Sequence, residues 1–484
     1  MKRFKLLLVS LGHRTISFPF TTPPMGVLSL AAYIRQQFPG AEIRVVDQRV
    51  LNCSVDELLR HVVEFEPDVT GFSCLTSFAY LLGPLTRKVR ESLPETLQVI
   101  GGPHASAFRA SALEGNAADV AVVGEGELAL EKLILSYLDG ALFENVPGLV
   151  WRDTSGQIVE NPPGEPIVDL DSLPFPAYDL INMDLYWKLA PMAALPARRY
   201  VSFFTSRGCP YHCIYCHNIF GKHFRGQSAE RMAAEVEYFT RKYNVREIEF
   251  LDDMFNFSGQ RLLDFCGLIG KRGVKLRINL PNSIRTDILT EEHIDALVDT
   301  GLYHASFALE TASPRLQKLI KKNLNIPKFL ENVERATRKG VFANGFTMLG
   351  FPTETEEELK LTIDTACESS FHTATFFTVI PYPQTALYEL ARQTYPEQLA
   401  EICYDASDYH GIRTNFSEVP DEVFLAYQRY AWRHFFLNPK RMWRIVRDFP
   451  DRRYLPHYLP VYLRRQMKGV FDGFHRKHAE KAEA

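Results

Sequence analysis

Residues 207–218 read Arg-Gly-Cys-Pro-Tyr-His-Cys-Ile-Tyr-Cys-His-Asn, and this stretch decides how the rest of the chain is interpreted. It places Cys209, Cys213 and Cys216 in a C-x₃-C-x₂-C pattern with no fourth cysteine nearby. Structural zinc sites and electron-transfer clusters normally use four protein ligands, whereas a [4Fe–4S] cluster held by three thiolates leaves one iron open to an outside ligand. The spacing therefore indicates a cluster that takes part in chemistry. The alternative is a zinc site whose fourth ligand is one of the two histidines of the stretch.

The 484 residues are enough for two or three domains. A net charge of −3 with 46% hydrophobic residues is typical of an ordinary globular protein and does not suggest a nucleic-acid partner. No apolar stretch approaches the roughly 20 residues that span a bilayer. The short apolar run at residues 6–9 predicts a first strand rather than a signal peptide. The five other cysteines are scattered, which indicates a cytoplasmic protein without a disulfide framework.

Residues 1–150 alternate short apolar runs with helical patterns. Strands are expected at 5–10, 43–47, 69–73, 98–101 and 120–123, and helices at 26–37, 55–64, 82–92 and 127–138. This alternation predicts an α/β fold: a doubly wound, Rossmann-like parallel sheet with helices on both faces. Such sheets bind ligands beyond the carboxyl ends of their strands. Glycines recur in the turns at those ends, where they let the backbone approach a flat or phosphate-bearing ligand closely.

A second alternation predicts a partial (β/α)₆ barrel at residues 195–385. Its strands are expected at 201–205, 248–252, 275–280, 304–308, 343–349 and 373–379, and its helices at 228–243, 258–272, 290–300, 313–321, 327–339 and 355–369. Six units are too few for a complete eight-fold barrel, so an open one is expected. Thr355 and Glu358 form a capping box at the start of the last helix. Residues 151–194, rich in proline and acidic residues, are expected to be a linker after an edge strand at 149–152.

The cysteine spacing, the Arg-Gly before the first cysteine and the aromatic Tyr215 before the last resemble the cluster motif of the radical S-adenosylmethionine (SAM) enzymes. The open six-unit barrel agrees with that resemblance.

The turns of the N-terminal unit, taken together and in order, resemble the cobalamin (B12)-binding domain that precedes the radical SAM domain in a large enzyme class. The residues that would contact cobalamin are Pro24, Gly26, Ser73, Cys74, Leu75, Thr76, Gly101, Gly102, Pro103, His104, Gly124, Glu125, Gly126 and Glu127.

The N-terminal unit lacks the Asp-x-His-x-x-Gly motif that supplies a histidine to cobalt in other cobalamin proteins. The resemblance therefore implies a cobalamin whose lower face has no histidine ligand, with the turn at residues 73–77 beneath the corrin. The alternative is a flavodoxin-like domain with another ligand or none.

The resemblance also places SAM contacts at the carboxyl ends of the barrel strands. Two acidic residues would receive the SAM ammonium, and an arginine would face its carboxylate, whose geometry a guanidinium matches. A Glu-x-x-Ser turn and a glycine-containing motif follow the fourth and fifth strands. The expected contacts are Tyr215, Asp252, Asp253, Arg285, Glu310, Ser313, Gly350, Glu354 and Tyr382. As alternatives, the two aspartates could cap a turn and the arginine could be a surface cation.

The resemblance covers about residues 5–385 and implies a cobalamin-dependent radical SAM enzyme with three cofactors: a [4Fe–4S] cluster, SAM and cobalamin. It implies that a 5′-deoxyadenosyl radical abstracts hydrogen from an unactivated carbon of a small-molecule or lipid-like substrate, and that methylcobalamin then delivers a methyl group. An external electron donor of the flavodoxin or ferredoxin type is implied as well. The alternatives are an oxidative cyclase without methyl transfer, an enzyme whose N-terminal unit is an empty scaffold, and a non-catalytic cobalamin- or metal-binding module.

Residues 386–484 are expected to be mainly helical and to control substrate access. Between residues 427 and 467, aromatic side chains interleave with arginine and lysine. This pattern predicts a helical cap over the barrel mouth with a solvated basic face. The alternative is an interfacial segment that rests on anionic lipid at the membrane periphery.

Overall fold

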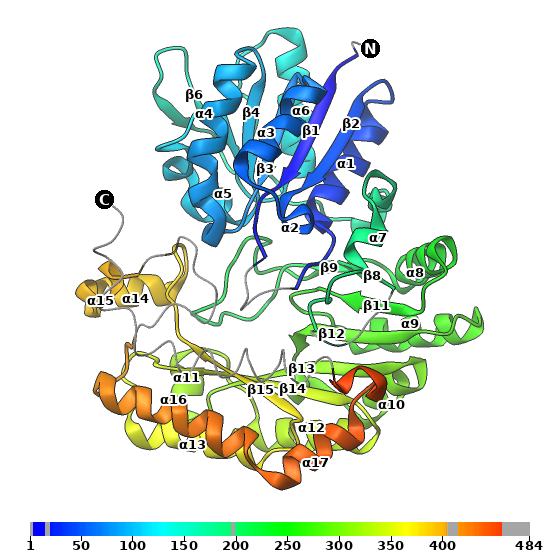
Figure 1. Ribbon diagram of the computed structural model, residues 1–484, viewed down its shortest axis with the longest axis vertical. Coiled ribbons are helices and arrows are strands. Elements are labelled where there is room, and N and C mark those ends of the chain that lie inside the picture. Colours follow the sequence, from blue (N-terminus) through cyan, green and yellow to red (C-terminus); the bar gives the residue numbers. More distant parts are fainter. Residues whose placement is uncertain are drawn as a thin grey trace.

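The computed structural model describes residues 3–14, 20–193, 195, 199–402, 404 and 415–456. Figure 1 shows an N-terminal unit, coloured blue to cyan, beside a second unit coloured green to yellow, each built on its own sheet. Helices α14 (Ala386–Thr394) and α15 (Pro396–Ala400) lie at the side where the two units face each other.

The N-terminal sheet has the strand order β2-β1-β3-β4-β5-β6-β7. Its first five strands in that order are parallel, and the last two continue it antiparallel. The strands are β1 (Lys5–Ser10), β2 (Glu42–Asp47), β3 (Val69–Ser73), β4 (Leu97–Gly101), β5 (Val120–Val122), β6 (Leu149–Arg152) and β7 (Ile158–Glu160). The predicted doubly wound sheet is confirmed. Strand β7 lies in residues 151–194, which were expected to be a linker. The first part of this segment therefore belongs to the sheet.

Helices cover both faces of this sheet. They are α1 (Met25–Gln37), α2 (Gln48–Leu51), α3 (Val55–Phe65), α4 (Leu82–Ser92), α5 (Gly102–Phe108) and α6 (Gly126–Asp139). In β1, Leu6 and Leu8 pack into the core beneath α1 and α6, while Leu7 and Val9 pack into the core beneath α3 and α4. A parallel strand covered on both faces needs a continuous apolar run, which explains the local sequence.

The second sheet is wholly parallel, with the order β15-β14-β13-β12-β11-β8. Its strands are β8 (Tyr200–Phe203), β11 (Glu247–Phe250), β12 (Arg277–Ile284), β13 (Leu302–Glu310), β14 (Phe342–Leu349) and β15 (Thr373–Thr378). The helices between them are α8 (Ala229–Tyr243), α9 (Gly259–Lys271), α10 (Glu291–Thr300), α11 (Pro314–Leu319), α12 (Ile326–Arg338) and α13 (Glu356–Glu368). The six strand–helix units agree with the predicted partial barrel.

The C-terminal region is helical, as predicted. After α14 and α15 come α16 (Asp421–Phe436) and α17 (Pro439–Asp448), which run along the outside of the barrel in Figure 1. Helix α16 packs on α13 and β15. Its Phe424, Phe435 and Phe436 are buried there, because β15 is an edge strand that leaves apolar surface to cover. This part of the region therefore covers the side of the barrel rather than its mouth.

Two arginines of α17 bind the end of α13. Arg441, only 2% exposed, donates hydrogen bonds to the carbonyls of Cys367 and Phe371, and Arg444 donates to Phe371 and Ser369. Cations at a helix C-terminus satisfy its unpaired carbonyls and its dipole. Not all of the basic face is therefore solvated. Residues from 457 on, where the aromatic and basic pattern continues, lie outside the described part of the chain.

Among the described helices, none combines the length and the apolar composition that a membrane crossing requires.

Candidate active site

The three cysteines of the expected cluster lie on one loop. Strands β9 (Ser206–Arg207) and β10 (Arg225–Gly226) pair antiparallel and close this loop at its base. Cys209, Cys213 and Cys216 are half-buried, form no disulfide and interact electrostatically with one another. Within the described residues no three His, Cys, Asp or Glu side chains are already gathered as metal ligands. The donor set still fits an iron–sulfur cluster, because three free thiols on one loop lie within electrostatic reach of each other.

Burial and the nearby Asp253 raise the pKa of the Cys216 thiol to about 12, and burial also raises the pKa of Cys209. Metal ligation requires thiolates, so loading the loop with iron releases protons. The Asp253 carboxylate lies 3.4 Å from His217 Nε2, directly after the last cysteine. Of the two aspartates expected to receive the SAM ammonium, Asp253 is the half-buried one beside the loop.

Asp252 holds the start of the cysteine loop. Its Oδ1 accepts hydrogen bonds from the backbone N–H of Thr205 at 3.0 Å, from the Thr205 hydroxyl at 2.8 Å and from the Ser206 hydroxyl at 2.5 Å. The residue is 1% exposed, and its buried Oδ2 receives no hydrogen bond from the described residues. Burial raises the pKa of this carboxyl. Asp252 therefore ties the end of β8 and the start of β9 to β11, and its role in SAM binding stays a prediction.

Tyr215 joins the cysteine loop to the fourth barrel strand. Its hydroxyl donates to Glu310 Oε1 at 3.2 Å, and Lys322 Nζ lies 3.2 Å from the same oxygen. Glu310 ends β13 with a φ of 60°, in the left-handed region that a glutamate rarely adopts. Such a conformation at a strand end re-aims the side chain and is common at functional sites.

Arg285 also reaches the cysteine loop. Its guanidinium lies 3.9 Å from the centre of the Tyr211 ring, between the first two cysteines, and forms an ion pair with Asp287 at 3.0 Å. Because its side chain is only 11% exposed, Arg285 is not a free surface cation. The arginine expected to face the SAM carboxylate thus lies beside the loop that carries the cluster ligands.

Other expected SAM contacts are engaged in local structure. The Ser313 hydroxyl caps α11 by accepting from Leu316 N–H and donates to Glu358 at 2.5 Å. Glu354 Oε2 accepts from the backbone N–H groups of Gly350 and Phe351, at 2.6 and 3.1 Å. Burial raises the pKa of Glu354 to about 7 in spite of these two hydrogen bonds. These contacts fix the turns after β13 and β14, and whether the same residues touch SAM stays a prediction.

The turns expected to bind cobalamin meet at the carboxyl end of the N-terminal sheet. The His104 N–H donates to the Cys74 carbonyl at 3.2 Å, and the Cys74 N–H to Gly101 at 3.4 Å. A Cβ on Gly102, whose φ is +83°, would lie 2.6 Å from Ser73 Oγ. Glycine is therefore required where the turn after β4 crosses the turn after β3. The expected Gly-Gly-Pro-His turn is the start of helix α5, with Pro103 in its first turn.

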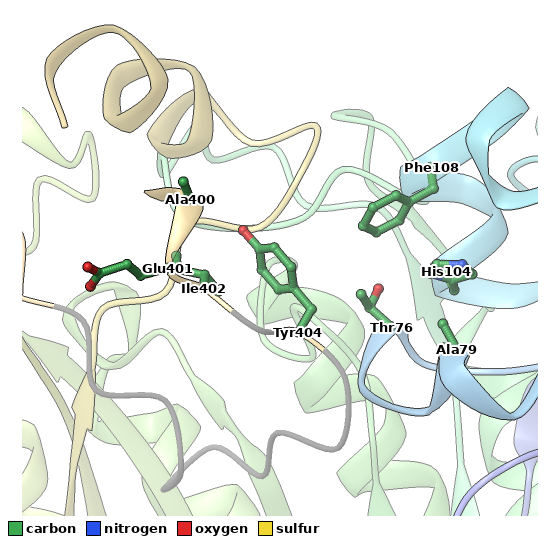
Figure 2. A pocket seen from close by; sticks show the side chains of 8 residues that line it. All are labelled: Thr76, Ala79, His104, Phe108, Ala400, Glu401, Ile402 and Tyr404. Atoms are coloured by element: carbon green, nitrogen blue, oxygen red, sulfur yellow. The ribbon is translucent and has the colours of Figure 1, made fainter. Parts of the chain in front are cut away.

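These turns also face open space that can receive a ligand. A Cβ on Gly26, Gly101 or Gly124 would meet nothing within 4 Å. A pocket of ≈ 440 Å³ lies beside them, between the turns of the N-terminal unit and the C-terminal region (Figure 2). It is lined on one side by Thr76, Ala79, His104 and Phe108, and on the other by Ala400, Glu401, Ile402 and Tyr404. The ring centre of Tyr404 lies 5.7 Å from that of Tyr382, which follows the last barrel strand.

Three other residues were expected to contact cobalamin. Leu75 is 40% exposed, while Pro24 and Gly126 lie at the starts of α1 and α6.

Glu125 and Glu127, also expected at the cobalamin site, bind arginines of the second unit. Arg207 donates to Glu125 at 2.7 Å and to Glu127 at 2.5 Å, and Arg225 donates to Glu125 as well. Burial alone would raise the pKa of Glu125, but the two arginines outweigh it and hold the pKa below its ordinary value. Because both glutamate side chains already bind arginines, only the backbone of this turn is left to contact cobalamin.

Four residues of this site have no role predicted from the sequence: Tyr211, Arg225, Lys322 and, beyond its place in the motif, Arg207. The first two belong to the cysteine loop and its closing strand, and Lys322 follows α11. A signal existed only for Arg207, which precedes the first cysteine by two residues.

Family comparisons agree with this geometry. A B12 binding domain model matches residues 14–134, and a Radical SAM superfamily model matches residues 203–366. An uncharacterised methyltransferase of Pyrococcus horikoshii is 31% identical over 402 residues, which are 81% of this chain and 84% of that protein. The chain belongs to the cobalamin-dependent radical SAM enzymes, a family that uses a [4Fe–4S] cluster, SAM and cobalamin.

Two further relatives carry specific names. The cytidylyl-2-hydroxyethylphosphonate methyltransferase of Streptomyces wedmorensis is 27% identical over 75% of this chain and 76% of its own length. The anaerobic magnesium-protoporphyrin IX monomethyl ester cyclase of Rubrivivax gelatinosus is 23% identical over 94% of this chain and 80% of its own. The solved structure of the methyltransferase TsrM from Kitasatospora setae, with cobalamin and a [4Fe–4S] cluster bound, has the same fold. Its TM-score is 0.71 at 18% identity, over 92% of this chain and 90% of that one.

Proposed function

We propose that this enzyme methylates an unactivated carbon of a small-molecule or lipid-like substrate. The observation that carries the proposal is the direct contact between the cysteine loop and the turn after β5: Arg207, two residues before Cys209, binds Glu125 and Glu127. Such a contact supports one shared site for the two cofactors. Relatives named as methyltransferases favour methyl transfer as the reaction.

The residues of the site have distinct roles in this proposal. Cys209, Cys213 and Cys216 hold the cluster and leave its fourth iron to SAM. Asp253, beside Cys216, receives the SAM ammonium, and Arg285 faces the SAM carboxylate. When bound, the cluster supplies the electron that cleaves SAM to methionine and a 5′-deoxyadenosyl radical, and cobalamin supplies the methyl group.

The barrel interior supports an apolar ligand near its mouth. Along β14, alternate residues are buried, while Asn344, Phe346 and Met348 on the opposite face are half-buried. Phe346 packs edge-to-face on Phe377 of β15, with ring centres 5.5 Å apart. Such rings can receive either the adenine of SAM or an apolar carbon skeleton, and they exclude water from a radical.

The C-terminal region supports a role in substrate access, because it contacts the cysteine loop. The N–H of Leu387, in α14, donates to the carbonyl of Ile214 at 2.9 Å, between two cluster ligands. Ala400, Glu401, Ile402 and Tyr404 form the wall of the Figure 2 pocket that faces the N-terminal unit. A substrate that enters here would pass between the C-terminal region and the turns expected to bind cobalamin.

The test uses SAM with a trideuterated methyl group, the anaerobically reconstituted protein and a strong reductant. The proposal predicts labelled methyl recovered with the cobalamin, S-adenosylhomocysteine, and 5′-deoxyadenosine from uncoupled cleavage. The variant with all three cysteines changed to alanine should form no 5′-deoxyadenosine. Formation of 5′-deoxyadenosine without any labelled methyl on cobalamin would overturn methyl transfer. It would favour a ring-forming reaction such as that of the named cyclase.

Two partners belong to the same proposal. Reduction of the cluster needs an external one-electron donor of the flavodoxin or ferredoxin type. Helix α17 would make a peripheral contact with anionic lipid, because its Met442 and Trp443 are 51% and 67% exposed beside Lys440. Binding to anionic vesicles that falls with rising salt would support that contact, and no binding at low salt would remove it.

A further inference from the structure

The cysteine loop is closed by a pair of arginines that face each other. Strands β9 and β10 are two residues each, and Arg207 is the register partner of Arg225. The residues between them include all three cysteines. A two-residue ladder is too short to hold a loop in place by itself, so further contacts must fix the base of the loop.

Both arginines use the same acidic turn of the N-terminal unit. Glu125 Oε2 accepts from Arg207 at 2.7 Å, and Glu125 Oε1 accepts from Arg225. Glu127 accepts from Arg207 through both of its oxygens, at 2.5 and 3.3 Å. All four carboxylate oxygens of the turn therefore bind the base of the cysteine loop.

This cluster of charges is enclosed. The side chains of Arg207, Arg225, Glu125 and Glu127 are 12%, 9%, 6% and 4% exposed. Two positive and two negative charges balance, which is the condition for burying them together. A second contact from the N-terminal unit to the segment before the barrel, between Arg35 and Asp179 at 2.6 Å, is by contrast 45% and 44% exposed. Such a surface pair contributes little.

The acidic turn is continuous with the turns expected to bind cobalamin. Glu125 follows Gly124, a glycine with φ +85° whose missing side chain leaves open space. Glu127 lies in the first turn of α6, and the N–H of Gly124 donates to Ser106 in α5. A displacement of this turn is therefore transmitted to α5, the helix that begins at Gly102.

We infer that Arg207 and Arg225 are positioning residues. Through their hydrogen bonds to Glu125 and Glu127, they fix the position of the cysteine loop relative to the turns expected to bind cobalamin. The inference rests on the proposed methyl transfer. Transfer of a methyl group between SAM and cobalt depends on the separation of the two cofactors, and a displacement of about 1 Å can cost a factor of about 100. Cleavage of SAM by the cluster alone needs no contact with the N-terminal unit.

The test compares Arg207→Met and Arg207→Lys with a matched control, Arg35→Met, in full-length, anaerobically reconstituted protein. Hydrogen exchange is measured at residues 208–224 and 123–127, because opening of a contact speeds exchange on both of its sides. The Arg207→Met variant should speed exchange at least 10-fold in both segments. Lysine at position 207 should give a partial effect, since a single ammonium cannot bridge two carboxylates as a guanidinium does. Arg35→Met should change neither segment.

The second readout is the ratio of labelled methyl on cobalamin to 5′-deoxyadenosine. It should fall at least 10-fold in Arg207→Met, with iron content, cobalamin content and 5′-deoxyadenosine formation within 2-fold of wild type. Unchanged exchange, or loosened segments with an unchanged ratio, would overturn the inference. A wild-type protein that places no methyl on cobalamin would instead overturn the proposed function, and the exchange data would still decide whether the arginines hold the loop.

Discussion

The Tyr215 hydroxyl donates a hydrogen bond to Glu310 Oε1 at 3.2 Å, which joins the cysteine loop to the end of β13. Lys322 contacts the same oxygen, so both partners of Glu310 approach one side of its carboxylate. Among the described residues, Oε2 receives no hydrogen bond. A carboxylate held in this way keeps one oxygen available at the edge of the barrel where SAM is expected.

Replacement of Glu310 by glutamine should weaken SAM binding about 10-fold, since a hydrogen bond to a charged group contributes roughly 1.5–3 kcal/mol. Glutamine keeps the acceptor for Tyr215 and should leave the cluster content unchanged. Equilibrium dialysis with labelled SAM, together with the SAM-induced change in the paramagnetic resonance of the reduced cluster, measures the effect. Wild-type affinity in the variant would remove Glu310 from the SAM site.

Two substitutions at Asp252 separate a structural role from SAM binding. Asp252→Ala removes the acceptor of three hydrogen bonds from Thr205 and Ser206 and leaves their buried donors unpaired, so it should destabilise the loop by about 3 kcal/mol and lower the iron content. Asp252→Asn keeps an acceptor oxygen and should retain iron. If the asparagine variant retains iron but loses SAM affinity, the carboxylate charge acts on SAM. If it loses iron as alanine does, the account of the hydrogen bonds is wrong.

The buried Arg441 should matter far more than its exposed neighbour Arg447. Arg441→Met removes the donors to the carbonyls of Cys367, in the last turn of α13, and Phe371, in the turn that follows, which predicts a loss of about 3 kcal/mol, seen as a lower thermal midpoint. Arg447, which pairs with Asp448 on the surface, is the matched control, and Arg447→Met should change the midpoint little. Equal effects of the two substitutions would contradict the packing of α17 described above.

The raised pKa of Glu354 predicts that the stability of the protein depends on pH. Burial raises its pKa from an ordinary 4.5 to about 7, so between these pH values the folded chain keeps a proton that the unfolded chain has released. Its contribution to stability therefore falls as pH rises through this window, by about 3 kcal/mol at 1.36 kcal/mol per pKa unit. Relative to wild type, Glu354→Gln should gain in thermal midpoint from pH 5 to pH 8. Glu331→Gln, on the exposed side of α12, should run parallel to wild type. A constant difference between Glu354→Gln and wild type across this range would show that Glu354 is ionised throughout.

Local patterns predicted the elements where burial is uniform. The apolar run of β1 begins and ends where expected, because a strand covered on both faces must be continuously apolar. The capping box of Thr355 and Glu358 also forms as predicted, because its geometry depends on four consecutive residues. Strand β7 was missed, since three half-buried or exposed residues carry no periodic signal.

The candidate site was predictable in its ligands but not in its contacts. The cysteine spacing is a local property, and it identified the loop. The pairing of Glu127 with Arg207 spans 80 residues, so no sequence pattern within either segment reveals it. The glutamates were accordingly expected at cobalamin, whereas their carboxylates bind arginines. Likewise, the aromatic stripe of α16 is apolar at helical spacing, and only the exposed edge at β15 determines what it covers.

We expect this one chain to hold both a three-cysteine cluster and a cobalamin that has no histidine on its cobalt. The paramagnetic resonance of cob(II)alamin bound to the anaerobically reconstituted protein, with iron determined on the same sample, tests both expectations. We expect about four iron per chain, a base-off cobalt signal without nitrogen splitting, and the same signal in His104→Ala, which removes the histidine that lines the Figure 2 pocket. Nitrogen splitting that disappears in His104→Ala, or a chain that takes up no cobalamin, would contradict these expectations.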